Sequence, residues 1–260
     1  MLNSLYGIHP EKLISFIGEY FPSYRARQLL KWVYDKFVFD TAQMTDLPAD
    51  FKDFIQNGFD LDMPVIEKKL ESTDGSVKFR LALADGAQIE MVLMPLEKKL
   101  TLCLSSQVGC ARACAFCATG KMGLVRNLQT HEIVQQVLLA AGQSSQRITN
   151  LVFMGMGEPL DNPDNVLEVL KLIQAEETLA FSPRRATIST CGIVPGIYRL
   201  ADSGIKAKLA VSLNSAVDRV RDELMPINKL YPLSVLKEAL LYFQKKAASG
   251  SPLNTSSSPA

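Results

Sequence analysis

The sequence has no apolar run that approaches the roughly 18 residues of a membrane-spanning helix, which argues against membrane association. It also has almost no net charge, because 28 Lys and Arg residues face 27 Asp and Glu residues for a net of +1. Such a balance gives no global attraction to nucleic acid, so an RNA-binding surface would need a local cluster of basic residues. With 47% apolar residues in 260, the chain can bury a large core, as one large domain or a large and a small one.

Histidine and cysteine are also scarce, with two His and five Cys residues. The odd number of cysteines and the absence of a signal-peptide pattern at the start argue against a disulfide framework. Thiols kept free indicate a reducing compartment, so we expect a cytoplasmic protein.

Three of the cysteines are grouped, since Cys110, Cys114 and Cys117 form a C-x3-C-x2-C triplet just after a strand-like run. Three thiolates on one loop can hold three irons of a [4Fe-4S] cluster and leave the fourth iron open for chemistry on a small molecule. A structural zinc site is the alternative, but it would need a fourth Cys or His nearby. Because His9 and His131 both fall outside the loop, the spacing favours the cluster.

The first 75 residues have helical periodicity, which predicts a small accessory domain of helices. One predicted helix opens at Ser23, which can serve as its N-cap, and continues to Tyr34. Four basic residues in this region can form a phosphate-binding face or an ordinary solvated one, namely Arg25, Arg27, Lys31 and Lys36.

From residue 76 the pattern changes to short strands and then to alternating strands and helices. The expected strands are 77–83, 88–95, 99–104, 148–154, 186–190 and 206–213, and the expected helices are 130–141, 164–174, 194–203, 217–224 and 233–246. Regular β-α alternation predicts an α/β fold with a parallel sheet, open or closed into a barrel. Only four β-α units follow from the cysteine-bearing strand onward, so a closed barrel is not expected. Residues 247–260 have little to bury and are expected to form a disordered tail.

Each predicted strand ends in groups suited to binding a polar ligand, and in either kind of sheet these ends should form one site. The strand at 148–154 leads into Gly155-Met-Gly-Glu-Pro, where glycines allow close backbone approach and Glu158 can accept from an ammonium group. The strand at 186–190 ends at Ser189-Thr-Cys-Gly, and the strand at 206–213 ends at Ser212-Leu-Asn. Alone, the Gly-Met-Gly loop would be an ordinary tight turn in most proteins, and the other loops are weak signals. Their recurrence beside a cysteine triplet is what favours a site.

Together these motifs resemble one family. The segments that carry the resemblance are Cys103-Leu-Ser-Ser-Gln-Val-Gly-Cys110, the triplet with Phe116, the run from Met154 to Leu160, Ser189-Thr-Cys-Gly and Met225-Pro-Ile-Asn-Lys229. They are similar to the RlmN and Cfr family of radical S-adenosylmethionine (SAM) adenine methyltransferases, over a stretch from about residue 24 to about residue 246. The resemblance implies a radical SAM (β/α) barrel over residues 76–246, incomplete in this chain, with an RNA-binding accessory domain at residues 1–75.

The resemblance also implies the cofactors and the residues that hold them. A [4Fe-4S] cluster on Cys110, Cys114 and Cys117 would chelate the amino and carboxylate groups of SAM and cleave it to a 5′-deoxyadenosyl radical. The SAM contacts would come from residues in three of the strand-end loops: Gly157, Glu158, Ser189, Ser212, Leu213 and Asn214. Methylation of carbon 2 of an adenosine needs such a radical route, because that carbon is not nucleophilic.

Two further residues match catalytic positions of the family. Cys103 resembles the cysteine that helps to release the methylated base, and its alternative is a small buried strand residue. Glu90 resembles the general acid/base, and its alternative is the solvent face of an alternating strand. Cys191 matches no catalytic cysteine, so we expect it to pack as a small residue.

The family pattern also contains a methyl-carrying cysteine and a SAM-contacting asparagine nearer its C-terminus, and no cysteine follows Cys191 here. We therefore expect a truncated copy of such an enzyme. The resemblance implies 23S rRNA and tRNA as substrates, an electron donor such as flavodoxin or ferredoxin, and a monomer. The alternatives are a catalytically dead cluster-binding fragment and a methyltransferase that acts on carbon 8.

Overall fold

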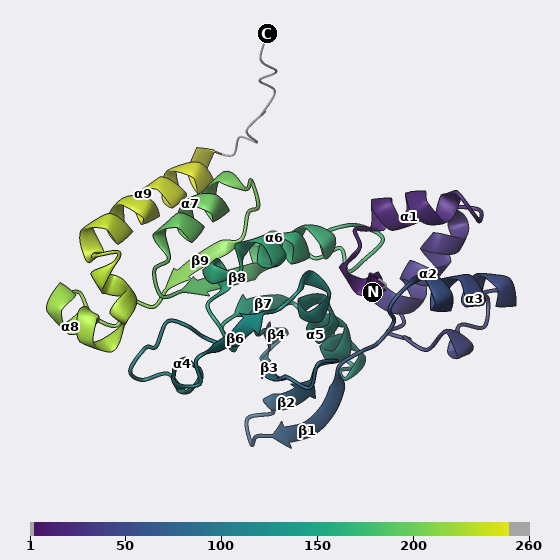
Figure 1. Ribbon diagram of the computed structural model, residues 1–260, viewed down its shortest axis with the longest axis horizontal. Coiled ribbons are helices and arrows are strands. Elements are labelled where there is room, and N and C mark those ends of the chain that lie inside the picture. The colour runs from purple at the N-terminus through teal and green to yellow at the C-terminus, as the bar shows by residue number, and fades with distance from the viewer. Residues whose placement is uncertain (1–2, 250–260) are drawn as a thin grey trace, which may run out of the picture.

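The computed structural model describes residues 3–249 as a group of N-terminal helices beside a larger α/β body (Figure 1). The N-terminal helices are α1 (Pro10–Gly18), α2 (Tyr24–Tyr34) and α3 (Ala49–Gly58). Helix α1 begins with Pro10 at a position where the missing N–H has no intrahelical partner to lose. Leu13 and Ile17, one turn apart on α1, are fully buried. This apolar stripe fixes the helix on the small core of the group.

Helix α2 confirms the predicted helix but not its predicted cap. Ser23 occupies the N-cap position with αR backbone angles, and its side chain makes no capping hydrogen bond. Its Oγ instead accepts from Arg27 at 3.5 Å. An N-cap side chain reaches the helix N–H groups from an extended backbone, so the αR geometry turns this hydroxyl away.

The predicted basic face is smaller than four residues. Lys36 follows the end of α2, and its Nζ lies 3.2 Å from the ring centre of Trp32. Arg25 is half-buried and donates to Gln28 at 2.7 Å. Arg27 and Lys31, one turn apart, are the exposed basic side chains of α2 itself, and Lys36 is exposed beyond its end.

Residues 65–71 form strand β1, which corrects the expectation that the segment is helical as far as residue 75. β1 (Val65–Glu71) pairs antiparallel with β2, and its register shifts between Ile66 and Lys68. Nearly every side chain of β1 is exposed. An edge strand with two solvated faces and a bulge has no period-2 pattern, so alternation could not reveal it.

The strands form one seven-stranded sheet in the order β1-β2-β3-β4-β7-β8-β9. Besides β1, these strands are β2 (Val77–Ala82), β3 (Gln88–Leu96), β4 (Lys99–Cys103), β7 (Asn150–Phe153), β8 (Ala186–Thr190) and β9 (Lys208–Val211). Pairing is antiparallel from β1 to β4 and parallel from β4 through β7 and β8 to β9. All six predicted strands are therefore confirmed, and the four parallel strands form part of a barrel wall.

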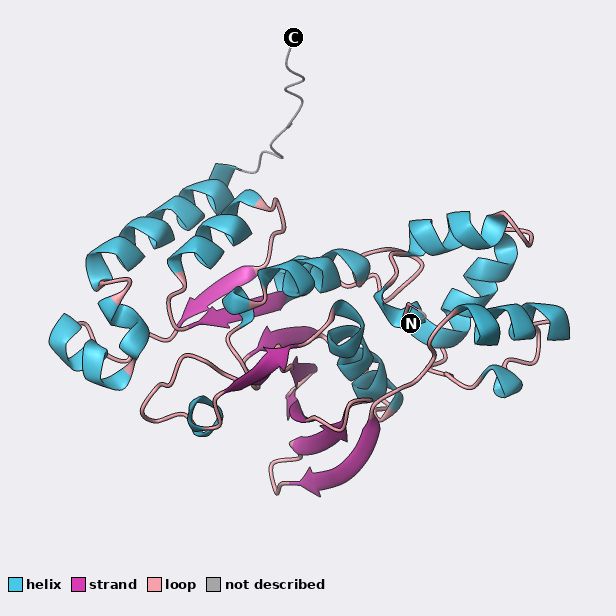
Figure 2. Ribbon diagram, in the orientation of Figure 1, coloured by secondary structure: helices cyan, strands magenta, loops and turns pink. Residues whose placement is uncertain are grey.

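Helices follow the parallel strands and pack beside one another in a row. They are α5 (Thr130–Gly142), α6 (Pro163–Leu172), α7 (Val194–Asp202), α8 (Asp218–Leu224) and α9 (Leu233–Ser249). Helix α5 contacts α6, α6 contacts α7, and α7 contacts α9. Figure 2 shows α6, α7 and α9 along one side of β7 to β9, with the loop that carries α4 (Ala118–Lys121) on the other side. This is the arrangement that right-handed β-α-β crossovers produce.

The register gives the sheet two different faces. Leu102, Leu151 and Ile188 lie on one face and are fully buried, so we call it the covered face. The opposite face, which we call the open face, carries Val92, Cys103, Val152, Thr187 and Ser189, and most of these side chains are only half-buried. In a barrel the open face would line the interior.

Helix α9 is the last element of residues 3–249. Helix α9 includes Ala247, Ala248 and Ser249, which corrects the expectation that a disordered tail begins at residue 247. The rest of that predicted tail, residues 250–260, lies outside the described residues. Among residues 3–249, no helix is both long and apolar enough to cross a membrane.

Candidate cofactor site at the strand ends

The cysteine triplet lies in a loop that is closed by a small hairpin. Strands β5 (Gln107–Gly109) and β6 (Leu124–Asn127) pair antiparallel on either side of the triplet. The Cys110 N–H donates to the Gly123 carbonyl at 2.8 Å. Gly109 has a φ of +75°, and a Cβ there would lie 1.9 Å from the Gly123 oxygen. Only glycine fits this crossing, so the loop shape is set by the backbone.

The thiols of the triplet are partly shielded from solvent. Cys110 is buried, while Cys114 and Cys117 are half-buried. Burial raises the pKa of Cys110 and of Cys114, and nearby negative charge on Glu158 raises both further. The Gly120 N–H donates to the Cys117 sulfur at 3.4 Å. Such a loop favours bound metal, because thiolates that are costly when bare are stabilised by a cation and by N–H donors.

The spacing of these thiols bears on the kind of metal group. Among residues 3–249, no three His, Cys, Asp or Glu side chains are arranged around one metal ion. Four thiolates on one zinc would lie about 3.8 Å apart, given Zn–S bonds of about 2.3 Å. In a [4Fe-4S] cluster each cysteine binds a different iron, so its thiols lie further apart. The donor set is three cysteine thiols on one loop, and this set fits a [4Fe-4S] cluster that keeps one iron open.

Glu158 is a buried carboxylate in the loop after β7, and no cation among residues 3–249 forms an ion pair with it. Its side chain accepts from the Leu160 N–H at 3.0 Å and from the Cys191 N–H at 2.7 Å. The residue is 4% exposed, and none of the ion pairs among residues 3–249 includes it. Desolvation raises the pKa of Glu158. A buried carboxylate without a counter-ion is well suited to bind a ligand ammonium group.

The glycine before this carboxylate brings the loop against the cysteine hairpin. Gly157 has a φ of +100°, and a Cβ there would lie 2.6 Å from the Gln107 side chain. Gln107 accepts from the Glu158 N–H at 2.8 Å and donates to Asn127 at 2.7 Å. The strand-end loop and both strands of the hairpin are therefore held together by one side chain.

The predicted residues of the next two strands lie on the same edge of the sheet. Ser189 is half-buried on the open face of β8, opposite Ala210 of β9. Ser212 extends β9, because its N–H donates to the Thr190 carbonyl at 2.9 Å. Leu213 and Asn214 follow as exposed residues, and Asn214 has a φ of +55°. The chain thus turns at the point where the sequence predicts ligand contacts.

Cys103 and Glu90 share the open face. Cys103 pairs with Val92 of β3, and Glu90 lies two residues further along β3, so its side chain points the same way. Burial raises the pKa of Cys103. Glu90 is half-exposed and forms an ion pair with Lys78 at 3.0 Å. Sharing a face with Cys103 fits a catalytic role for Glu90. The exposure of the Glu90 side chain fits the solvent-face interpretation equally well.

Several buried polar residues that organise the site were not predicted. Ser105 is fully buried, donates to the Glu90 carbonyl at 2.6 Å and accepts from the Met156 N–H at 2.9 Å. Gln136 of α5 is also fully buried and brackets the backbone of Ser105, accepting from its N–H at 2.9 Å and donating to its carbonyl at 3.1 Å. The available sequence clue was a Gln at an inward position of an apolar helix, since buried polar groups need partners.

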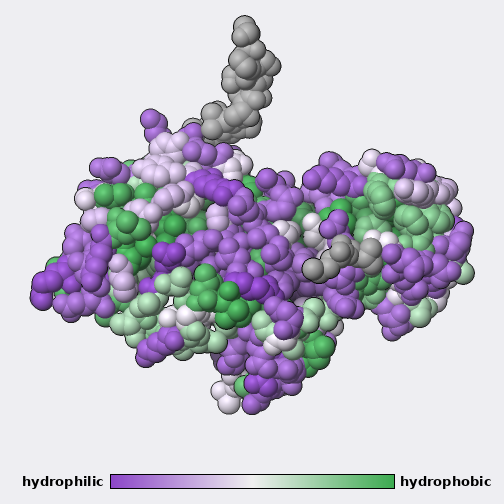
Figure 3. All heavy atoms as spheres, in the orientation of Figure 1, coloured by the Kyte–Doolittle hydropathy of each residue, from purple (hydrophilic) through white to green (hydrophobic). Residues whose placement is uncertain are grey.

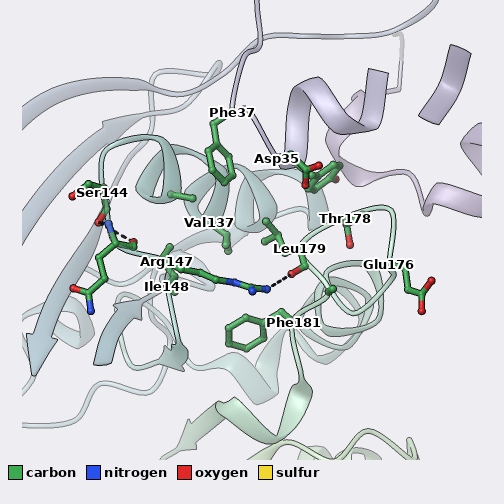
Figure 4. Close-up of a pocket in the computed structure, with 15 residues that line it drawn as sticks. Asp35, Phe37, Val137, Ser144, Arg147, Ile148, Glu176, Thr178, Leu179 and Phe181 are labelled. Carbon is green, nitrogen blue, oxygen red and sulfur yellow. Dashed lines mark hydrogen bonds between the residues drawn. The ribbon is translucent and has the colours of Figure 1, made fainter. Parts of the chain in front are cut away.

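A separate cavity lies at the opposite end of the parallel strands. It has a volume of about 560 Å³ and lies between the end of α2, the end of α5 and the loop before β8 (Figure 4). Arg147 extends across it and donates to the Leu179 carbonyl at 3.2 Å. Phe37 and Phe181 also line it, and no predicted site residue does. The strand-end chemistry is therefore distinct from this cavity.

Apolar side chains surround the cysteine loop on the surface. Phe116, Met122, Leu124 and Val125 are all exposed, and Figure 3 shows hydrophobic surface beside β6. An exposed apolar rim around the cysteine loop is a surface that another macromolecule can cover.

Comparison with known proteins gives a consistent result for both parts of the chain. A sequence profile described as the Radical SAM superfamily matches residues 104–248. A second profile, described as the ribosomal RNA large subunit methyltransferase N-terminal domain, matches residues 3–58. A crystal structure of a radical SAM methyltransferase from Sphaerobacter thermophilus superposes with a TM-score of 0.90 at 37% identity, covering 95% of this chain and 74% of that one.

Curated relatives carry the name dual-specificity RNA methyltransferase RlmN. The protein of Bdellovibrio bacteriovorus is 46% identical over 221 residues, which cover 83% of this chain and 54% of the relative. The protein of Geobacter sulfurreducens is 45% identical and covers 91% and 65%, and that of Syntrophobacter fumaroxidans is 46% identical and covers 88% and 67%. This chain spans about half to two thirds of the length of these relatives. The chain belongs to the radical SAM superfamily and, within it, to the RlmN family.

Proposed function

We propose that this protein is an RNA methyltransferase of the RlmN type, which methylates carbon 2 of an adenosine in 23S rRNA and in tRNA. Family membership implies a [4Fe-4S] cluster and SAM as cofactors. When bound, these groups supply radical chemistry, which carbon 2 of adenine requires because it is not nucleophilic. The observation that carries the proposal is the buried carboxylate of Glu158 beside the cysteine loop, which has no cationic partner in the described part of the chain.

The chain's own residues hold and orient the cofactors in this proposal. Cys110, Cys114 and Cys117 hold the cluster, and Glu158 binds the ammonium group of SAM. Ser189 and the residues from Ser212 to Asn214 contact the rest of SAM. Support comes from their position along one sheet edge, from the positive φ of Asn214 and from the polar groups that these loops offer.

Cys103 and Glu90 handle the base in the proposed reaction. Burial raises the pKa of Cys103, so the thiol keeps its proton until a base removes it. Glu90 lies on the same face and is the carboxylate that would move a proton during methyl transfer. We propose that Cys103 then acts in release of the methylated base from a methyl-carrying cysteine, which is not among these 260 residues.

RNA binding is proposed for the N-terminal helices. The relatives are named as RNA methyltransferases, and the profile that matches residues 3–58 is named for ribosomal RNA methyltransferases. Arg27 and Lys31 are exposed one turn apart on α2, a spacing that suits adjacent phosphates. A protein electron donor such as flavodoxin or ferredoxin is proposed to reduce the cluster across the apolar rim of the cysteine loop.

One observation favours a second candidate function. The sequence has no cysteine after Cys191, and burial strongly raises the pKa of Cys191. Within these 260 residues no second reactive thiol is available to carry a methyl group. The second candidate function concerns these 260 residues alone, and it is binding of the cluster and SAM without methyl transfer to RNA.

Anaerobic reconstitution separates these candidates. The loaded chain is reduced in the presence of SAM and a 23S rRNA fragment or tRNA, and 5′-deoxyadenosine and methylated nucleosides are measured by mass spectrometry. The proposed function requires 5′-deoxyadenosine and 2-methyladenosine together, whereas 8-methyladenosine would assign the carbon 8 alternative. 5′-Deoxyadenosine without a methylated nucleoside supports the second candidate. A chain with a full complement of iron and sulfide that forms neither product would refute both.

A further inference from the structure

The most buried cation of the α/β body is Arg221 of α8, and it joins three segments of the site. The residue is fully buried. Its guanidinium donates from Nε to the Leu213 carbonyl at 3.1 Å, from one terminal nitrogen to Asn228 at 2.8 Å and from the other to the Cys191 carbonyl at 2.6 Å. Leu213 comes after β9, Asn228 after α8 and Cys191 after β8. One planar side chain therefore connects two strand ends to the loop beyond α8.

This guanidinium has no carboxylate partner among residues 3–249 within ion-pair distance. Two acids of α8, Asp218 and Asp222, accept from Asn228 instead, at 2.8 and 2.7 Å. Asn228 itself accepts from Arg221. Keeping an unpaired cation in the interior is costly, and desolvation lowers the pKa of Arg221. A residue that served packing alone would not need this charge.

The acceptors of Arg221 are attached to the proposed cofactor contacts. The peptide groups of Cys191 connect two charges, since its N–H donates to Glu158 at 2.7 Å and its carbonyl accepts from Arg221 at 2.6 Å. The Leu213 carbonyl comes immediately before Asn214, which has a φ of +55°. Gly192 has a φ of +111°, and a Cβ there would lie 3.3 Å from the guanidinium. The backbone at both strand ends is thus fitted to this side chain.

The same helix also anchors the cysteine loop. The Ala115 N–H, between Cys114 and Cys117, donates to the Leu224 carbonyl at 2.9 Å. Leu224 ends α8, less than one turn after Arg221. A displacement of α8 would therefore move the thiol loop and both strand ends together.

We propose that Arg221 is a positioning residue for SAM binding. It holds the Glu158 carboxylate in its binding arrangement through the Cys191 peptide groups. It also holds the turn at Leu213 and Asn214. This inference rests on the proposed use of the strand ends to bind SAM. It assigns Arg221 no direct contact with SAM, and it gives Cys191 a role through its backbone rather than its thiol.

The test compares Arg221→Ala and Arg221→Lys with a matched control, Arg219→Ala. Arg219 lies on the same helix with its side chain 83% exposed and pairs with Glu223. Lysine keeps the charge but cannot span three divergent acceptors. Each protein is reconstituted, its iron content is measured, and the change that SAM causes in the electron paramagnetic resonance spectrum of the reduced cluster is titrated.

We expect the SAM midpoint to rise at least tenfold in Arg221→Ala and by a smaller factor in Arg221→Lys, with the spectrum before SAM addition unchanged. The Arg219→Ala midpoint should equal the wild-type one. A purely structural role would lower the folded, iron-loaded fraction without moving the midpoint of the protein that remains, so that result in either Arg221 variant overturns the inference. A wild-type cluster that does not respond to SAM overturns the proposed function instead.

Discussion

Replacing Glu158 with Gln removes the charge of the strand-end carboxylate and keeps its shape. In the wild type this carboxylate accepts two backbone N–H groups, is 4% exposed and has no cationic partner among the ion pairs of residues 3–249. Burying an ion without a partner costs several kcal/mol. If the site is built for an ammonium group, removing the charge should stabilise the empty protein and weaken the ligand.

The effect of Glu158 on the free energy of unfolding depends on pH. Desolvation raises the pKa of Glu158, so above the ordinary Glu pKa of about 4.3 the folded protein binds more protons than the unfolded chain. Wild-type stability therefore falls as pH rises through the window between the ordinary and the raised pKa, and this contribution stays unfavourable at neutral pH. Gln has no such titration, and its NH₂ group leaves one N–H donor unsatisfied at a cost of about 1–3 kcal/mol. We expect a net gain of about 1 kcal/mol for Glu158→Gln at pH 7.

The affinity effect is larger and opposite. Removing one partner of a buried, hydrogen-bonded charge pair costs about 2–5 kcal/mol. At about 1.4 kcal/mol for each factor of ten, SAM should bind about 30-fold to 4,000-fold more weakly. Urea unfolding of the cluster-free protein at pH 4.5 and 7 measures the first effect, and equilibrium dialysis of SAM with the reconstituted protein measures the second.

Glu223→Gln is the matched control, because that side chain is 69% exposed on α8. It should change neither quantity. If Glu158→Gln binds SAM within twofold of the wild type, or is less stable than the wild type at neutral pH, the reasoning from an unpaired buried carboxylate is wrong.

Three further substitutions test other parts of the structure. Gly109→Ala places a Cβ 1.9 Å from a carbonyl oxygen at a φ of +75°, so urea unfolding should show a loss above about 2 kcal/mol. Ser105→Ala leaves the buried Met156 N–H without its partner, and we expect a loss of about 1–3 kcal/mol, with a Ser105→Thr variant closer to wild type. Burial lowers the pKa of His131, so the unfolded chain binds more protons below pH about 6.5 and stability falls as pH decreases through that range. His131→Gln should flatten this part of the stability profile, and an unchanged slope would show that His131 does not cause it.

The strands and helices could be predicted where each had one buried and one exposed side. The strand at 186–190 and the helix at 194–203 match β8 and α7 to within one residue, because apolar residues recur there with the period of the element. Strand β1 could not be found this way, since its side chains are exposed on both faces and a bulge interrupts its register. The capping role of Ser23 failed because backbone angles decide capping, and residue type alone does not determine them.

The site divides in a similar way. Thiols and strand-end loops are visible in sequence because their residue types are unusual at those positions, and the parallel register then aligns them. Arg221 and Ser105 act through hydrogen bonds to backbone carbonyls of distant segments, and a carbonyl acceptor leaves no trace in the sequence. Glu90 is an intermediate case, because alternation fixes which face it occupies but not what that face meets.

The hairpin of β5 and β6 bears on how the protein recovers after losing its cluster. Bringing together the ends of a free loop of about a dozen residues costs about 2 kcal/mol in chain entropy. Here the Cys110 N–H already bonds to the Gly123 carbonyl, and the crossing at Gly109 is packed by backbone atoms alone. That cost is met during folding, so iron and sulfide enter a loop that is already closed. Oxidative loss of the cluster should leave a folded chain that can be reloaded many times without being synthesised again.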